Sequence, residues 1–227
     1  MKEITVQQIT DAVRTLCMDV SFDLPRDVEA ALTDGLAKEE SPFGKYCLEQ
    51  ILHNCHLARE SRQAMCQDTG IAVVYLTVGQ DVHITGGSLE EAIHEGVRQG
   101  YEDGYLRKSV VEEPLFERSN TGDNTPAVIH TEIVPGDALR IMVVPKGAGS
   151  ENMGAVKMLK PADGLEGAKQ FILDTVRNAG GNPCPPIVVG VGVGGFKTVG
   201  CVGQGDTCEQ AHRGQQSRKT QDGVFHE

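Results

Sequence analysis

Two cysteines stand in short segments whose neighbours are suited to chemistry. Cys66 is followed directly by Gln67 and Asp68 in a turn before an aliphatic run, so a thiolate and a carboxylate can face one cleft. Cys184 lies in the segment 182–186 (NPCPP), whose prolines stiffen the backbone and present the sulfur rigidly, as suits a metal ligand. Each also has a plain explanation, since a cysteine can be buried and an aspartate can cap a turn. The local patterns leave both kinds of role open.

Two further sequence patterns give weaker indications of a binding site. The run Gly190–Gly195 satisfies G-x-G-x-x-G, and Glu209 lies near the distance expected of a ribose-binding acid, as in a dinucleotide site. The preceding apolar run is very short, prolines precede it, and the residues that follow are not helix formers, which disfavours that site. A possible zinc cluster has a C-x6-C-x3-H spacing, which matches no common structural zinc site. Its residues are Cys201, Cys208 and His212.

Composition restricts the class of protein. The chain has 227 residues and is 39% hydrophobic, which is enough for a packed core and excludes a disordered or fibrous chain. A net charge of −11 disfavours binding to nucleic acid or anionic membranes, and 4% aromatic residues without tryptophan give no base-stacking surface. The first ten residues lack the apolar block of a signal peptide, and the odd number of cysteines indicates reduced thiols. We expect a cytoplasmic protein.

Helices are predicted for the first 60 residues, because apolar residues recur there at helical spacing from Val6 to Val20 and from Val28 to Leu36. A third helix begins at Ser41-Pro42, which supply an N-cap and a first-turn proline. Its apolar stripe contains Phe43, Cys47, Ile51 and Cys55, so both of these cysteines are predicted to be core residues.

Strands and further helices are predicted after residue 70. The β-branched run Ile71 to Val78 predicts a strand, and Ser88 with Glu91 has the spacing of a capping box that opens a helix towards Tyr105. The runs 127–133 and 138–144 are predicted to pair as a hairpin, a helix is expected over 166–177, and 187–193 is expected to be a buried strand. We therefore predict an α+β fold, with N-terminal helices packed with a mixed, largely antiparallel sheet.

Five motifs together carry a resemblance to a known family. In chain order they are 66–70 (CQDTG), 120–126 (NTGDNTP), 146–153 (KGAGSENM), 157–161 (KMLKP), and 184–186 (CPP) leading to the glycine run. This set resembles the alpha subunit, or N-terminal part, of class I fumarase, the iron–sulfur hydro-lyase family that includes tartrate dehydratase. The resemblance covers residues 1–195 and predicts a catalytic domain there.

The resemblance implies a 4Fe-4S cluster held by three cysteines, with Cys66 and Cys184 as two of them. The third is expected further along the family's chain, beyond the break in the resemblance at Gly195, and so absent from this chain. The iron without a protein ligand would act as a Lewis acid on a substrate hydroxyl. Arg107 matches the family's carboxylate-binding arginine, and Gln67 and Asp68 match residues near that iron, with Asp68 a candidate proton-relay or orienting group.

The resemblance also implies a substrate and a partner. Gly149 matches the glycine of the KGxGS loop, where a bare backbone lets substrate approach closely. The segments 150–153 and 157–161 resemble fumarase more than tartrate dehydratase, which favours fumarate and malate. A separate beta subunit, in a heterotetramer or dimer, is implied. The alternatives left open are a cluster-free, nonenzymatic remnant, a tartrate dehydratase-type subunit, and a nucleotide-binding module.

Residues 196–227 differ in amino-acid composition from the rest of the chain. They contain no Leu, Ile or Met, and their acidic and basic residues balance, so we expect a disordered segment. A single-base shift of the reading frame near Phe196 would explain this abrupt change of composition. On that hypothesis, the chain expressed alone is expected to be poorly soluble, without a cluster and inactive.

Overall fold

The computed structural model describes residues 2–194 and 221–224. The chain divides into two compact units, residues 1–146 with 218–227, and residues 147–217. The described elements of the first unit are β1 (Lys2–Thr5), α1 (Val6–Phe22), α2 (Arg26–Lys38), α3 (Pro42–Ser61), β2 (Ile71–Gly79), β3 (Val82–Thr85), α4 (Leu89–Asp103), β4 (Val128–Val134), β5 (Leu139–Lys146) and β6 (Gln221–Val224). Those of the second are α5 (Ala148–Glu151), a short 3-10 helix (Pro161–Asp163) and α6 (Gly164–Ala179). The α+β prediction is confirmed.

The predicted helix starts are found where their capping residues stand. Thr5 and Gln8 form a reciprocal capping box at the start of α1, and the Ser41 hydroxyl accepts a hydrogen bond from the Gly44 amide at the start of α3. On α3, Cys55 is buried as predicted, whereas Cys47 is half-buried and Phe43 is 75% exposed. The prediction that both cysteines are core residues is therefore confirmed for Cys55 and wrong for Cys47, which lies towards the exposed N-terminal end of the helix.

The four-stranded sheet of the first unit is mixed, and its strand order corrects the predicted hairpin. The order is β4-β2-β5-β6, with β2 parallel to β4 and antiparallel to β5, so β4 and β5 are not neighbours. Burial explains the order: most of β2 is buried, including Ala72, Val73, Val74 and Leu76, whereas β4 is at most half-buried. The most apolar strand takes the central position, and the less apolar strand takes an edge.

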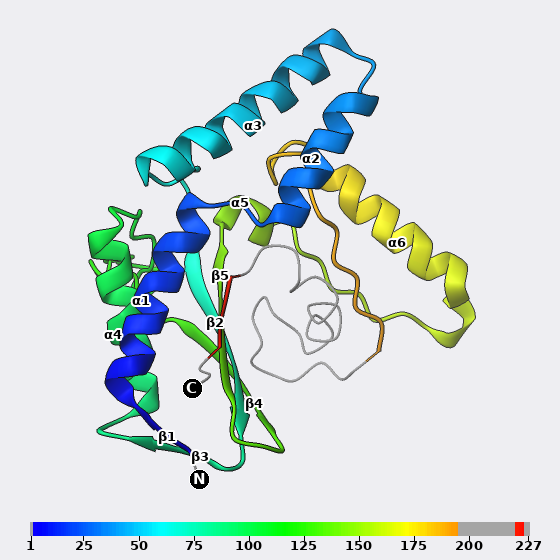
Figure 1. The fold of residues 1–227 in the computed structure, drawn as a ribbon. Helices are drawn as coiled ribbons and strands as arrows, with labels where there is room; N and C mark the ends of the chain where they lie inside the picture. Colours follow the sequence, from blue (N-terminus) through cyan, green and yellow to red (C-terminus); the bar gives the residue numbers. More distant parts are fainter. Residues whose placement is uncertain (1, 195–220, 225–227) are drawn as a thin grey trace. The chain divides into compact units, whose positions relative to one another are not determined.

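Helices α1 and α4 lie side by side against the sheet (Figure 1), and their apolar residues form one core with β2 and β5. Two glycines of α4 allow this close approach. A Cβ on Gly96 would lie 2.7 Å from the Thr10 carbonyl oxygen, and a Cβ on Gly100 would lie 2.8 Å from the Arg14 carbonyl oxygen. Both obstacles are backbone atoms, so the helices would have to separate to admit a methyl group.

Two glycine substitutions with opposite expected effects test this packing. Gly96→Ala is expected to lower the free energy of unfolding by about 1–3 kcal/mol, because overpacking forces α1 and α4 apart. Gly35→Ala, in α2, is expected to raise it by about 0.5–1 kcal/mol, because nothing lies within 4 Å of the added Cβ and alanine favours helix. Urea unfolding of both variants measures the difference. Equal stability of the two variants would contradict the packing explanation.

The segment 187–193 corrects another prediction, because it is not a strand. Val188 is 51% exposed and Val193 is 78% exposed, and no described strand pairs with the segment. An apolar run becomes a buried strand only where a neighbouring strand supplies hydrogen-bond partners, and the described residues supply none.

The predicted disordered segment 196–227 lies outside the described residues except at 221–224. These four residues form β6, a strand not expected from their composition, which pairs antiparallel with β5. Backbone groups at a sheet edge accept a strand of almost any composition, which explains why side-chain pattern did not signal it.

Among the described helices, none is long and apolar enough to cross a membrane.

Candidate functional site

The loop before β2 presents two of the candidate residues to solvent. Cys66 and Gln67 are exposed, and the Cys66 sulfur lies 3.6 Å from Gln67 Oε1. Asp68 is half-buried, and its Oδ1 accepts a hydrogen bond from the Gly70 amide at 3.1 Å. Gly70 has a φ of 68°, a conformation that favours glycine. Asp68 therefore caps this turn, and the cap gives its carboxylate a defined orientation.

Arg107 belongs to a segment that is hydrogen-bonded to the same loop. The Thr69 hydroxyl donates to the Arg107 carbonyl oxygen at 3.1 Å, and the buried Leu106 anchors the chain beside it. The Arg107 side chain is exposed and forms no ion pair with any residue in the described ranges 2–194 and 221–224. Its guanidinium is therefore not engaged by a described carboxylate, unlike those of Arg59 and Arg98.

The described cysteines divide by burial. Burial raises the pKa of the Cys17 thiol to about 12, and it also raises the pKa of Cys55, with the nearby Glu29 carboxylate adding to the effect. These two thiols stay protonated and act as small apolar core residues. Cys66 and Cys184 are both exposed, so their sulfurs can reach a group bound at the surface of their units.

In the second unit, Cys184 and Gly149 lie on adjoining segments. Cys184 has a φ of 57°, which is uncommon for a residue with a side chain, and its amide donates to the Gly181 carbonyl oxygen at 3.1 Å. A Cβ on Gly149 would lie 2.9 Å from the Asn182 carbonyl oxygen. The glycine thus allows α5 to approach the turn that carries Cys184.

The structure groups the six candidate residues into two sets. Cys66, Gln67, Asp68 and Arg107 belong to the first unit, and Gly149 and Cys184 to the second. Among the described residues there is no group of three or more His, Cys, Asp or Glu side chains that could hold a metal ion.

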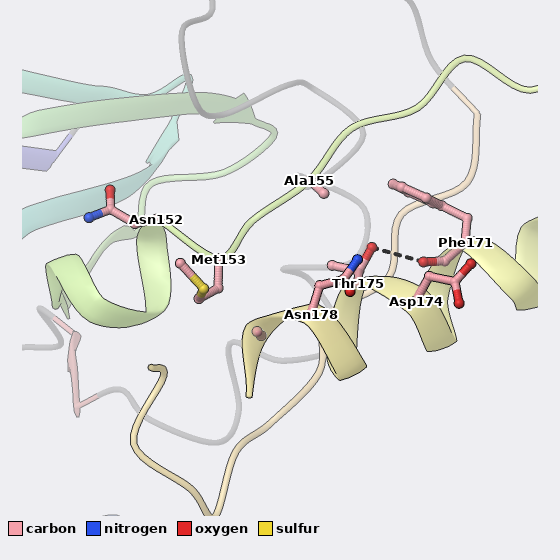
Figure 2. A pocket seen from close by; sticks show the side chains of 8 residues that line it. Asn152, Met153, Ala155, Phe171, Asp174, Thr175 and Asn178 are labelled. Carbon is pink, nitrogen blue, oxygen red and sulfur yellow. Dashed lines mark hydrogen bonds between the residues drawn. The ribbon is translucent and has the colours of Figure 1, made fainter. Parts of the chain in front are cut away.

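A pocket of about 310 Å³ lies within the second unit, between α6 and the segment that follows α5. Figure 2 shows Asn152 and Met153 on one side and Phe171, Thr175 and Asn178 of α6 on the other, with the Thr175 hydroxyl donating to the Phe171 carbonyl oxygen. None of the candidate residues lines this pocket. It is therefore a separate feature of the unit.

Sequence reasoning missed the residues that hold the loop and the Arg107 segment together. The Tyr101 hydroxyl donates to the carbonyl oxygens of Thr69 at 3.0 Å and Gly70 at 3.1 Å, and burial raises the pKa of Tyr101, so the hydroxyl remains a donor. Asn124 is fully buried beside the same loop. A sequence signal existed for Asn124, which stands in the turn-rich motif 120–126, but the pattern does not reveal its partners.

Comparison with known proteins identifies the family. The family model described as fumarate hydratase (Fumerase) matches residues 10–211. The chain therefore belongs to the fumarate hydratase family, an enzyme family of hydro-lyases. The matched range includes the segments that carry all six candidate residues.

Several relatives that it matches are named as alpha subunits. A protein of Methanocaldococcus jannaschii assigned as L(+)-tartrate dehydratase subunit alpha is 43% identical over 196 residues, which is 85% of this chain and 69% of the relative. The L(+)-tartrate dehydratase subunits alpha of Escherichia coli strains UTI89 and K12 are 31% and 30% identical over 85% of this chain. The chain spans 64% of the length of these two relatives.

Proposed function

We propose that this chain is the alpha-type subunit of an iron–sulfur hydro-lyase that interconverts fumarate and malate. One observation supports this most directly: an exposed thiol, Cys66, stands on a loop that is hydrogen-bonded to the segment of Arg107, whose guanidinium pairs with no described carboxylate. The proposed metal-ligating sulfur and the proposed carboxylate-binding cation thus belong to hydrogen-bonded segments in a member of a hydro-lyase family.

The donor set is compatible with a 4Fe-4S cluster. Clusters of this type are held by cysteine thiolates, and Cys66 and Cys184 are exposed whereas Cys17 and Cys55 are buried with raised pKa values. We propose Cys66 and Cys184 as two ligands, with a third supplied outside the described residues. When bound, the cluster supplies a Lewis-acidic iron that polarises the substrate hydroxyl.

The protein side chains have distinct proposed tasks. The planar guanidinium of Arg107 binds one substrate carboxylate through two parallel hydrogen bonds, and Gln67, adjacent to Cys66, orients the substrate by its amide. In malate dehydration, a proton leaves one carbon, the hydroxyl leaves its neighbour, and the C–H electron pair becomes the double bond. Asp68 is the proposed acceptor of that proton at its carboxylate, which the Gly70 amide keeps oriented.

Gly149 is proposed as a substrate-contacting position of the second unit. Its lack of a side chain leaves the backbone of α5 accessible, and it also admits the Asn182 carbonyl oxygen beside it. Any side chain here would therefore disturb the turn that carries Cys184 as well as the approach of substrate.

A separate beta subunit is the proposed partner, because the relatives are named as alpha subunits. Their name also favours a second candidate substrate, L(+)-tartrate. The motifs 150–153 and 157–161 favour fumarate instead, by their resemblance to fumarase.

The test is coexpression with a matching beta subunit and a complete alpha C-terminus, anaerobic reconstitution with iron and sulfide, and assay of the complex with each substrate. We expect absorbance near 400 nm and oxygen-sensitive hydration of fumarate. The chain without its partner is expected to be inactive. Dehydration of L(+)-tartrate without fumarate hydration would change the proposed substrate to L(+)-tartrate. A cluster-containing complex that is inactive on both substrates would overturn the proposed function.

The arginine assignment has its own prediction. Arg107→Lys replaces a two-pronged donor with a point charge and is expected to weaken malate binding by about 1–3 kcal/mol, with the cluster spectrum unchanged. Initial-rate kinetics measure this as a raised KM. Arg140→Lys, at another exposed arginine of the first unit, serves as the matched control and is expected to leave KM unchanged. Equal KM values for Arg107→Lys and the unsubstituted enzyme would refute the carboxylate-binding role.

A further inference from the structure

Asn124 occupies an unusual position for a polar residue. It is 0% exposed and has a φ of 62°, in the left-handed region. A buried carboxamide is costly unless both its oxygen and its nitrogen find partners. The hydrogen bonds of this side chain therefore explain why it is tolerated there.

Those hydrogen bonds join two segments that are far apart in the sequence. Asn124 Oδ1 accepts from the Ser109 amide at 2.7 Å and from the Val110 amide at 3.3 Å. Its Nδ2 donates to the Gly70 carbonyl oxygen at 3.2 Å. One side chain thus connects the residues that follow Arg107 to the loop that carries Cys66 and Asp68.

Neighbouring contacts reinforce this connection. The Tyr101 hydroxyl bonds to the carbonyl oxygens of Thr69 and Gly70, and the Thr69 hydroxyl donates to the Arg107 carbonyl oxygen. The carboxamide is the group that suits the central position, because it both donates and accepts. An aspartate would retain the acceptor for Ser109 and Val110 but would place a carboxylate oxygen against the Gly70 carbonyl.

The residue before Asn124 fixes its backbone. Asp123 Oδ2 accepts from Arg98 Nε at 3.0 Å, and Asp123 Oδ1 accepts from the Thr125 amide at 3.0 Å and hydroxyl at 2.8 Å. Desolvation opposes ionisation of Asp123, but these bonds to Thr125 and Arg98, with one to Thr121, outweigh it and lower its pKa to about 2. The charged Asp123 therefore anchors this turn to α4 over the ordinary pH range.

We propose that Asn124 is a positioning residue, which sets the location of the Arg107 guanidinium relative to the Cys66–Asp68 loop. The functional consequence rests on the function proposed above: a substrate carboxylate bound by Arg107 reaches the proton acceptor only if the two segments keep their spacing. Tyr101 acts on the same loop from α4.

Hydrogen exchange tests the connection without requiring activity. In Asn124→Asp, mass spectrometry is expected to show exchange at least ~10-fold faster in both segments, 66–72 and 105–111, because a carboxylate oxygen held against the Gly70 carbonyl repels it and breaks the connection between the segments. Tyr101→Phe removes one hydroxyl and keeps the ring, and it is also expected to make hydrogen exchange faster in the segment 66–72. This variant replaces Asn124→Asp as the test if Asn124→Asp does not fold.

Thr10→Val is the matched control. It removes another buried hydrogen bond of the same unit, from the Thr10 hydroxyl to the Ala92 carbonyl oxygen at 2.9 Å. It is expected to lower the melting temperature and leave the relative exchange of the two segments unchanged. If the Asn124 and Tyr101 variants behave like Thr10→Val, the proposal is overturned.

Kinetics of the reconstituted complex test the consequence. Asn124→Asp is expected to raise the KM for malate by about 10-fold, and this effect should shrink by at least ~3-fold when Arg107 is already lysine, because both changes act on one contact. Fully additive effects would indicate loss of stability alone and overturn the positioning role. If the unsubstituted complex hydrates no dicarboxylate, the proposed function fails, while the exchange experiment still decides whether Asn124 sets the spacing of the two segments.

Discussion

Cys66→Ala is expected to abolish the absorbance near 400 nm and the fumarate hydration activity together in the complex with a beta subunit. Cys184→Ala is expected to have the same effect. The reason is that a cluster held by three protein thiolates loses one of its attachments, and the remaining two do not retain it reliably. Absorbance, iron content and initial rate, measured on the same anaerobic preparation, check the prediction.

Cys47→Ala is the control for both cysteine variants. Cys47 is half-buried on α3 and belongs to no candidate site, so its replacement is expected to leave cluster and activity intact. A full cluster and normal activity in Cys66→Ala or Cys184→Ala would remove that cysteine from the proposed ligand set. Cluster loss in Cys47→Ala as well would indicate a general instability of the chain.

Asp68→Asn is expected to lower kcat at least ~100-fold with a smaller change in KM. The substitution preserves the shape of the side chain, and the asparagine Oδ1 can still accept the hydrogen bond from the Gly70 amide, so the turn remains. What is lost is a carboxylate that can accept a proton. Steady-state kinetics with malate, with the cluster spectrum as a check on integrity, measure the two parameters separately.

A surface aspartate supplies the comparison for this variant. Asp137→Asn alters an exposed aspartate in the turn between β4 and β5 and is expected to leave kcat unchanged. If Asp68→Asn retains near-normal turnover, Asp68 is only the turn cap that its hydrogen bond to Gly70 already demonstrates.

Features set by neighbouring residues could be predicted from the sequence alone. The apolar spacing of α1, the Ser41 cap of α3 and the β-branched run of β2 all depend on interactions within a few residues, and the structure confirms these elements. The family could also be identified, because its motifs are short and contiguous. Among the cysteines, the sequence predicted both Cys47 and Cys55 in the core; this is confirmed for Cys55 and wrong for Cys47, which is only half-buried.

The tertiary structure alone decided which distant segments become partners. The runs that became β4 and β5 looked like a hairpin because they are adjacent in sequence, yet β2 lies between them, since its apolar residues gain most from the central position. The short strands β1 and β3 were missed because four residues carry little pattern, and they exist through pairing with each other. Asn124 reads as one more turn residue, and its connection of Gly70 to Ser109 follows only from the buried position that the folded chain provides. Burial and hydrogen bonding between distant residues depend on the whole fold, so a local sequence pattern does not predict them.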